Sequence, residues 1–174
     1  IKSLHRPYNQ NLNSVKWVCN FIKEKNSNNE IPKSEFYIEF YVYLIKKLYN
    51  LYQKNPNEHL THGIPSFDSV KKSYDIIIGK SKKNKKKIIN IALTNREEEF
   101  EKSIFSTYKA TSYFINLAKD KLDFVDSNNM LTETGVELVN FRSSYFKLSG
   151  KEKKVLFSSI IKNDFHFFIS LSLL

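Results

Sequence analysis

Apolar residues recur every three or four positions along most of this chain, which is the period of an amphipathic helix. The first such stretch predicts a helix over Asn13–Lys25. A second helix is predicted over Pro32–Lys54, and because its apolar residues cover most of its circumference, we expect it to be central. Ser66 is expected to cap a third helix over Phe67–Ile78.

The second half of the chain predicts further helices and one short hairpin. Thr94 and Glu97 have the spacing of a capping box, and the apolar period that follows them predicts two helices with a break near Ser106–Thr107. Leu122–Val125 then leads into a turn-forming Asp-Ser-Asn-Asn run, and Met130-Leu131 returns. This alternation predicts a short β-hairpin.

Three more helices are predicted after the hairpin, each from a capping residue. Thr132 is expected to cap a helix over Glu133–Phe141. Ser149 and Glu152 form a second capping box, which predicts a helix to about Lys162, and Asp164 is expected to cap a last helix over Phe165–Leu174.

These elements predict a mainly α fold with a small β-hairpin, namely a helical domain that contains a winged helix-turn-helix. We divide the chain into a helical subdomain (1–79), a basic loop and short strand (80–94), a winged-helix segment (95–142) and C-terminal helices (143–174). No Gly/Ser-rich linker separates these parts, so we expect them to form one domain, with the alternative of a division near residues 80–94.

The charge of the chain is concentrated in one segment. Its 174 residues carry a formal net charge of +10, with 25 Lys against 3 Arg. Lys71–Asn90 holds 8 of the Lys and one acid, Asp75, so +7 of the charge lies within twenty residues. A lysine-rich loop can track DNA phosphates without selecting a sequence. The alternative is a solvated loop whose lysines reflect the codon usage of an A/T-rich genome.

The order helix, helix, hairpin, helix over 97–141 predicts a winged helix, in which the helix before the wing faces the bases. In the major groove, Lys can bond the edge of guanine and Asn the edge of adenine, and Ser and Thr can bond either of these bases. We expect the base-facing residues to be Thr107, Lys109, Ser112, Tyr113 and Asn116. The expected wing tip is Asn128 and Asn129. The expected phosphate contacts are Lys80, Lys82, Lys83, Lys85, Lys86 and Lys87.

The stretch Tyr108–Phe141 resembles a winged-helix signature, with an aromatic recognition helix, an Asn-rich turn and Leu-Thr-x-x-Gly at the start of a helix. Together with Ile31–Lys47, it resembles the DNA-recognition regions of type IIS restriction and nicking endonucleases. The resemblance implies sequence recognition on double-stranded DNA, with cleavage performed by a catalytic domain elsewhere. A transcription regulator and a helical protein–protein interaction module are the alternative functions.

No catalytic motif, metal site or cofactor site is recognised in the sequence. Glu152-Lys153-Lys154 is expected to lie on a solvated helix face. His59 and His62 lack a clear third zinc ligand, and the single cysteine, Cys19, is expected to be a buried apolar residue.

The expected partners follow from the same features. Double-stranded DNA is the main one, and the apolar stretch Phe165–Leu174 is a candidate contact with a second domain or subunit. No membrane partner is expected, since no apolar run is long enough to span a bilayer. The expected location is the cytoplasm, or the nucleus in a eukaryote.

Overall fold

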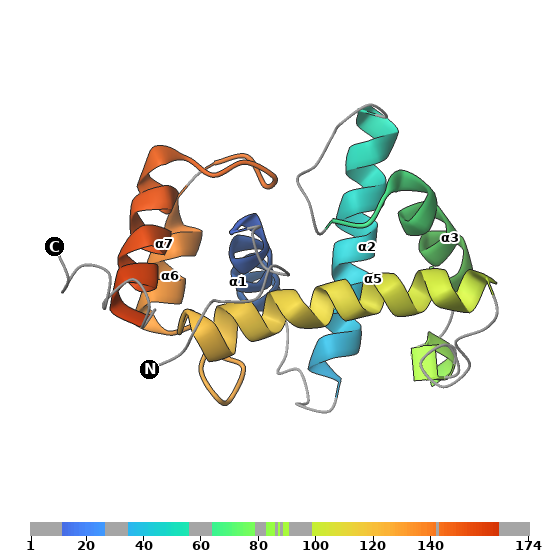
Figure 1. Cartoon of the computed structure of the whole chain (residues 1–174), viewed down its shortest axis with the longest axis horizontal. Helices are drawn as coiled ribbons and strands as arrows, with labels where there is room; N and C mark the ends of the chain where they lie inside the picture. The colour runs from blue at the N-terminus through green and yellow to red at the C-terminus, as the bar shows by residue number, and fades with distance from the viewer. Residues whose placement is uncertain are drawn as a thin grey trace, which may run out of the picture. The chain divides into compact units, whose positions relative to one another are not determined.

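The chain folds into helices (Figure 1), and its residues divide into two compact units. The computed structural model describes residues 12–26, 35–55, 64–78, 83–85, 87, 89–90, 99–141 and 143–163. Its elements are α1 (Asn13–Asn26), α2 (Phe36–Lys54), α3 (Phe67–Ile77), α5 (Glu99–Asn116), the π-helix η2 (Leu117–Lys121), α6 (Glu133–Asn140) and α7 (Gly150–Asn163). Unit 1 comprises Ile1–Lys33 and Tyr113–Leu174, and unit 2 comprises Ser34–Ser112.

In unit 2, α2 is the central helix, as its apolar circumference predicts. Most of its predicted apolar stripe is buried, namely Phe36, Phe40, Leu44, Leu48, Tyr41 and Ile45, whereas Tyr37 and Leu51 are half-buried. α3 lies along α2, with Tyr74 stacked on Tyr49 and Phe67 edge-on to Tyr52. The predicted cap of α3 is confirmed, because the Ser66 side chain accepts a hydrogen bond from the Ser69 backbone N–H.

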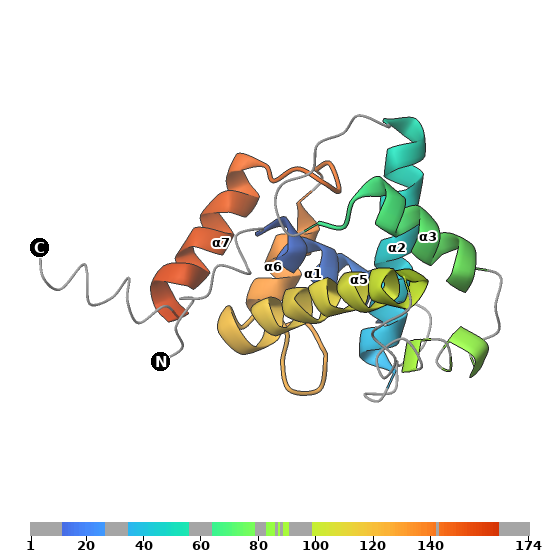
Figure 2. The same cartoon turned by 45° about the vertical axis from the view of Figure 1, so that its right-hand side comes forward.

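In unit 1, α1 packs against α6 and η2, and α7 packs against α6 (Figure 2). The apolar stripe of α1, Val15, Val18, Phe21 and Ile22, is buried, and Trp17 of the same helix is buried as well. The Trp17 ring stacks parallel to Tyr145 and meets Phe114 and Phe146 edge-on. The core of this unit therefore joins a helix near the start of the chain to residues more than a hundred positions later.

The predicted helix break at Ser106–Thr107 is wrong, since α5 runs without interruption from Glu99 to Asn116. Its threonines do not break the helix because their hydroxyls bond to carbonyls of the same helix, Thr107 to Ile104 and Thr111 to Tyr108. The separate pair of helices that a helix-turn-helix requires is therefore not formed over 99–116.

The predicted wing is also wrong, and with it the winged-helix fold class. Val125 and Leu131 form a single antiparallel bridge, and the described residues contain no strand (Figures 1 and 2). The chain offers too few residues for a returning strand: the turn ends at Asn129, and Thr132 already caps α6, so only Met130 and Leu131 lie between them. The fold is helical over the described residues.

The start of α6 combines a confirmed cap with a close backbone contact. Thr132 accepts a hydrogen bond from the Gly135 N–H and donates its own hydroxyl to the Asp123 carbonyl. A Cβ on Gly135 would lie 2.2 Å from the Phe124 carbonyl oxygen, so this glycine lets the helix approach the preceding segment. The Leu-Thr-x-x-Gly motif thus serves local packing in this fold.

Where the structure describes it, the segment 80–94 differs from the expected basic loop and short strand. Residues 83–85, 87 and 89–90 are helical, and Ile89 is fully buried. Lysine is a good helix former, and one buried isoleucine gives this segment an inward face. The expected capping box at Thr94 and Glu97 and the helix over Phe165–Leu174 lie outside the described residues.

Candidate functional site

The predicted phosphate-contacting lysines lie in unit 2 where the structure describes them. Lys83 and Lys87 are exposed and Lys85 is half-buried. On α3, Lys71 and Lys72 are exposed, with Asp75 also exposed on that helix. Lys80, Lys82 and Lys86 lie outside the described residues. The described part of the segment therefore presents cations to solvent, as phosphate binding requires.

Thr107 does not face solvent, so it cannot contact a base. Its side chain is 1% exposed, and its Oγ1 lies 2.9 Å from the Tyr41 hydroxyl and 3.3 Å from the Ser73 hydroxyl. This cluster of three hydroxyls ties α5 to α2 and α3 inside unit 2. Burial raises the pKa of Tyr41 to about 12, while hydrogen bonds from Ser73 and Thr107 act in the opposite direction.

The other expected base-facing residues are divided between the two units. Lys109 is exposed and Ser112 is half-buried in unit 2, and the Ser112 hydroxyl donates to the Lys109 carbonyl. Tyr113 and Asn116 are half-buried and belong to unit 1. Base contact by these four residues remains a prediction. The wing that would place them in a DNA groove is not formed.

The expected wing tip is a turn with its own internal bonds. The Asp126 carboxylate accepts hydrogen bonds from the Asn128 and Met130 N–H groups. Asn128 is exposed, but Asn129 is 9% exposed, has a positive φ of 62°, and its Oδ1 accepts from the Lys119 ammonium at 2.7 Å. Asn129 therefore stabilises the turn and is not available to DNA.

A buried ion pair is the main polar cluster in the core of unit 1, and no pattern in the sequence points to its partner on α1. Lys16 Nζ lies 2.8 Å from Glu152 Oε1, with side-chain exposures of 4% and 0%. The expectation that Glu152 lies on a solvated helix face is thus wrong. Its neighbours Lys153 and Lys154 are exposed, as expected.

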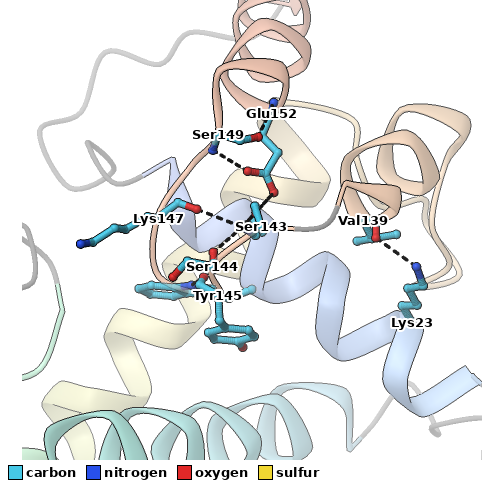
Figure 3. A network of polar contacts seen from close by, with 10 residues as sticks. Lys23, Val139, Ser143, Ser144, Tyr145, Lys147, Ser149 and Glu152 are labelled. Carbon is cyan, nitrogen blue, oxygen red and sulfur yellow. Dashed lines mark hydrogen bonds and ion pairs between the residues drawn. The ribbon is translucent and has the colours of Figure 1, made fainter. Parts of the chain in front are cut away.

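The ion pair organises the segment between α6 and α7 (Figure 3). Lys16 donates to Ser143 Oγ and to the carbonyls of Ser144 (2.7 Å) and Lys147 (3.0 Å). One α1 side chain therefore bonds to three residues of the 143–149 segment. The neighbouring Trp17 adds a further bond, because its Nε1–H donates to the Tyr145 carbonyl at 2.8 Å.

Glu152 completes the predicted capping box of α7. Its Oε2 accepts from the Ser149 N–H at 2.6 Å, Ser149 Oγ accepts from the Glu152 N–H, and Oε1 also accepts from the Ser143 hydroxyl. Burial raises the pKa of Glu152, but the hydrogen bonds from Lys16, Ser143 and Ser149 outweigh burial, so its pKa is lowered overall. Both charges of the pair are held by hydrogen bonds within the chain, which indicates a structural role for this site.

The remaining chemical candidates are inert where they are described. Cys19 is fully buried, and burial raises the pKa of its thiol, so it is unreactive. His59 and His62 lie outside the described residues. Within the ranges that the structure covers, no three His, Cys, Asp or Glu residues group as metal ligands, and no helix has the length and apolar character to cross a membrane.

Comparisons with known proteins do not assign this chain to a family. No family model, curated protein or solved structure matches this chain. Its function must therefore be inferred from the residues and geometry described above.

Proposed function

We propose that this chain binds double-stranded DNA through its sugar–phosphate backbone, using the lysines of the basic segment in unit 2. The observation that carries the proposal is the concentration of +7 of the net charge in Lys71–Asn90, together with the exposure of Lys83 and Lys87. Lysine is a point charge on a flexible stem, which suits phosphate contacts more than base recognition.

The proposal is limited to binding that does not depend on sequence. Thr107 is buried and Asn129 is committed to its turn, so two of the expected DNA contacts are absent. The resemblance to restriction-enzyme recognition regions stays a prediction, because no family model, curated protein or solved structure matches the chain. We further propose a cytoplasmic location, or a nuclear one in a eukaryote, supported by the DNA partner and the lone buried Cys19.

The test is a titration of the full chain with two duplexes of unrelated sequence at several salt concentrations. We expect equal affinity for both duplexes and a linear fall of log K with log salt. The variant Lys83→Gln/Lys87→Gln should weaken binding to both duplexes alike. It should reduce the salt slope by roughly 0.9 for each phosphate that is no longer neutralised.

The matched control is Lys46→Gln/Lys54→Gln, which removes two exposed lysines of α2 in the same unit. It should leave the affinity and the salt slope close to those of the unmodified chain. An equal loss in both variants would show that net charge, and not the basic segment, drives binding. Binding that is absent, or insensitive to salt, would refute the proposal.

A further inference from the structure

The outer face of α7 combines positive charge with exposed apolar side chains. Val155, Leu156 and Ser159 are buried, together with Glu152, and they anchor the helix in unit 1. The exposed residues of α7 form one continuous arc at helical spacing. They are Lys151, Lys153, Lys154, Phe157, Ser158, Ile161 and Lys162, with Gly150 at the start of the helix.

This arc carries no negative charge of its own. The one acid of α7 is Glu152, which points into unit 1 and is neutralised there by Lys16. The ion pair therefore leaves the four exposed lysines of the helix without an acidic neighbour on the same element. A surface of this kind attracts an anionic partner.

Two large apolar side chains lie within the cationic arc. Phe157 is 56% exposed and Ile161, one helical turn later, is 45% exposed. Single exposed apolar residues are ordinary, but here an aromatic and an aliphatic side chain one turn apart are bordered by lysines. The face therefore combines the two interactions that draw a protein surface to an anionic membrane, burial of apolar area and attraction to charged lipid. The sequence that follows α7, Phe165–Leu174, holds seven Phe, Ile or Leu residues among ten.

We propose that the outer face of α7 docks on an anionic lipid surface, with Phe157 and Ile161 entering the headgroup region and the lysines facing the lipid phosphates. A second copy of the chain fits this face poorly, because a two-fold interface would place its lysines against themselves. Anionic lipid supplies both features that the face requires, negative charge and an apolar layer beneath it.

The experiment is co-sedimentation of the full chain with vesicles of phosphatidylcholine, with and without phosphatidylserine. We expect binding to the phosphatidylserine vesicles alone and weaker binding as salt rises. Phe157→Ser should weaken binding about tenfold, and Lys153→Gln/Lys154→Gln about 25-fold. Circular dichroism of each variant should match that of the unmodified chain, since all three positions are exposed.

Val136→Ser is the matched control. Val136 on α6 is 45% exposed, as Ile161 is, but the exposed charged residues beside it on the helix are the acids Glu133 and Glu137. Loss of this apolar side chain should leave vesicle binding unchanged, since the neighbouring acids keep α6 away from anionic lipid. An equal loss of binding in Val136→Ser would contradict the assignment to α7.

A fluorescent variant separates lipid from an acidic protein as the partner. Trp17 is the single tryptophan and is fully buried, so Phe157→Trp adds a probe whose emission should shift to the blue on phosphatidylserine vesicles. A shift with polyglutamate but not with vesicles would overturn the proposal. Vesicle binding that survives both the Phe157 and the lysine variants would also overturn it. Neither result bears on DNA binding, which uses lysines of unit 2.

Discussion

At the scale of single residues, the buried Lys16–Glu152 pair links α1 to α7 in unit 1. Each charge is buried, and each has hydrogen bonds beyond the ion pair, so the desolvation cost is offset by several polar contacts. The pair also holds the 143–149 segment, through the Ser144 and Lys147 carbonyls and the Ser149 N–H. The ion pair therefore fixes the conformation of the 143–149 segment in addition to contributing to stability.

Removing one member of the pair should destabilise the chain strongly. Lys16→Met leaves Glu152 buried without its cation, which should lower the free energy of unfolding by about 3–5 kcal/mol. The double variant Lys16→Met/Glu152→Leu should recover much of this loss, because no uncompensated charge remains. Urea unfolding of the two single variants and the double variant measures the coupling. Additive losses would contradict a direct interaction.

The lowered pKa of Glu152 predicts how the free energy of unfolding depends on pH. The pKa of Glu152 is lower in the folded chain than its ordinary value of 4.5. A group of this kind stabilises the fold fully above the unfolded pKa, and the contribution is lost as pH falls through 4.5 toward the lowered value. Unfolding free energies measured from pH 7 to pH 3 should fall more steeply for the unmodified chain than for Lys16→Met/Glu152→Leu.

At the scale of elements, local signals decide where several helices begin. Ser66, Thr132 and the Ser149–Glu152 box all cap the helices that they predict, because a cap needs only residues a few positions apart. The break expected in α5 has no such signal. It rests on β-branched residues, which the helix accommodates by bonding their hydroxyls to its own carbonyls.

Gly135 provides a test of how α6 meets the preceding segment. In Gly135→Ala, the new Cβ would lie 2.2 Å from the Phe124 carbonyl, so backbone must shift, and we expect a loss of about 1–3 kcal/mol in thermal or urea unfolding. Gly150→Ala is the control, since nothing lies within 4 Å of a Cβ there. It should be neutral or stabilising by up to about 1 kcal/mol.

At the scale of the whole molecule, unit 1 is assembled from residues far apart in the chain. α1 has its packing partners in η2 and α6, and Trp17 has its partners at Phe114, Tyr145 and Phe146. Unit 2, in contrast, is one continuous stretch, Ser34–Ser112. The division into units therefore does not follow the four consecutive segments expected from the sequence.

A shortened chain should reveal this long-range assembly. A variant that ends at Arg142 lacks Tyr145, Phe146 and Glu152, which pack on Trp17 or neutralise Lys16. We expect its Trp17 emission to shift to the red and to become accessible to acrylamide, since the indole loses its cover. Emission identical to that of the full chain would contradict the packing described for unit 1.

Local sequence was sufficient to predict where most helices lie, which of their faces are buried and which residues cap them. These properties depend on periodicity and on contacts between near neighbours, so Phe40, Leu44 and Ser149 could be interpreted without a fold. The burial of Thr107 and Glu152, which are polar residues, became evident from the fold alone. A polar side chain enters a core when partners from distant segments satisfy it, and those partners, such as Lys16 for Glu152, have no signature in local sequence.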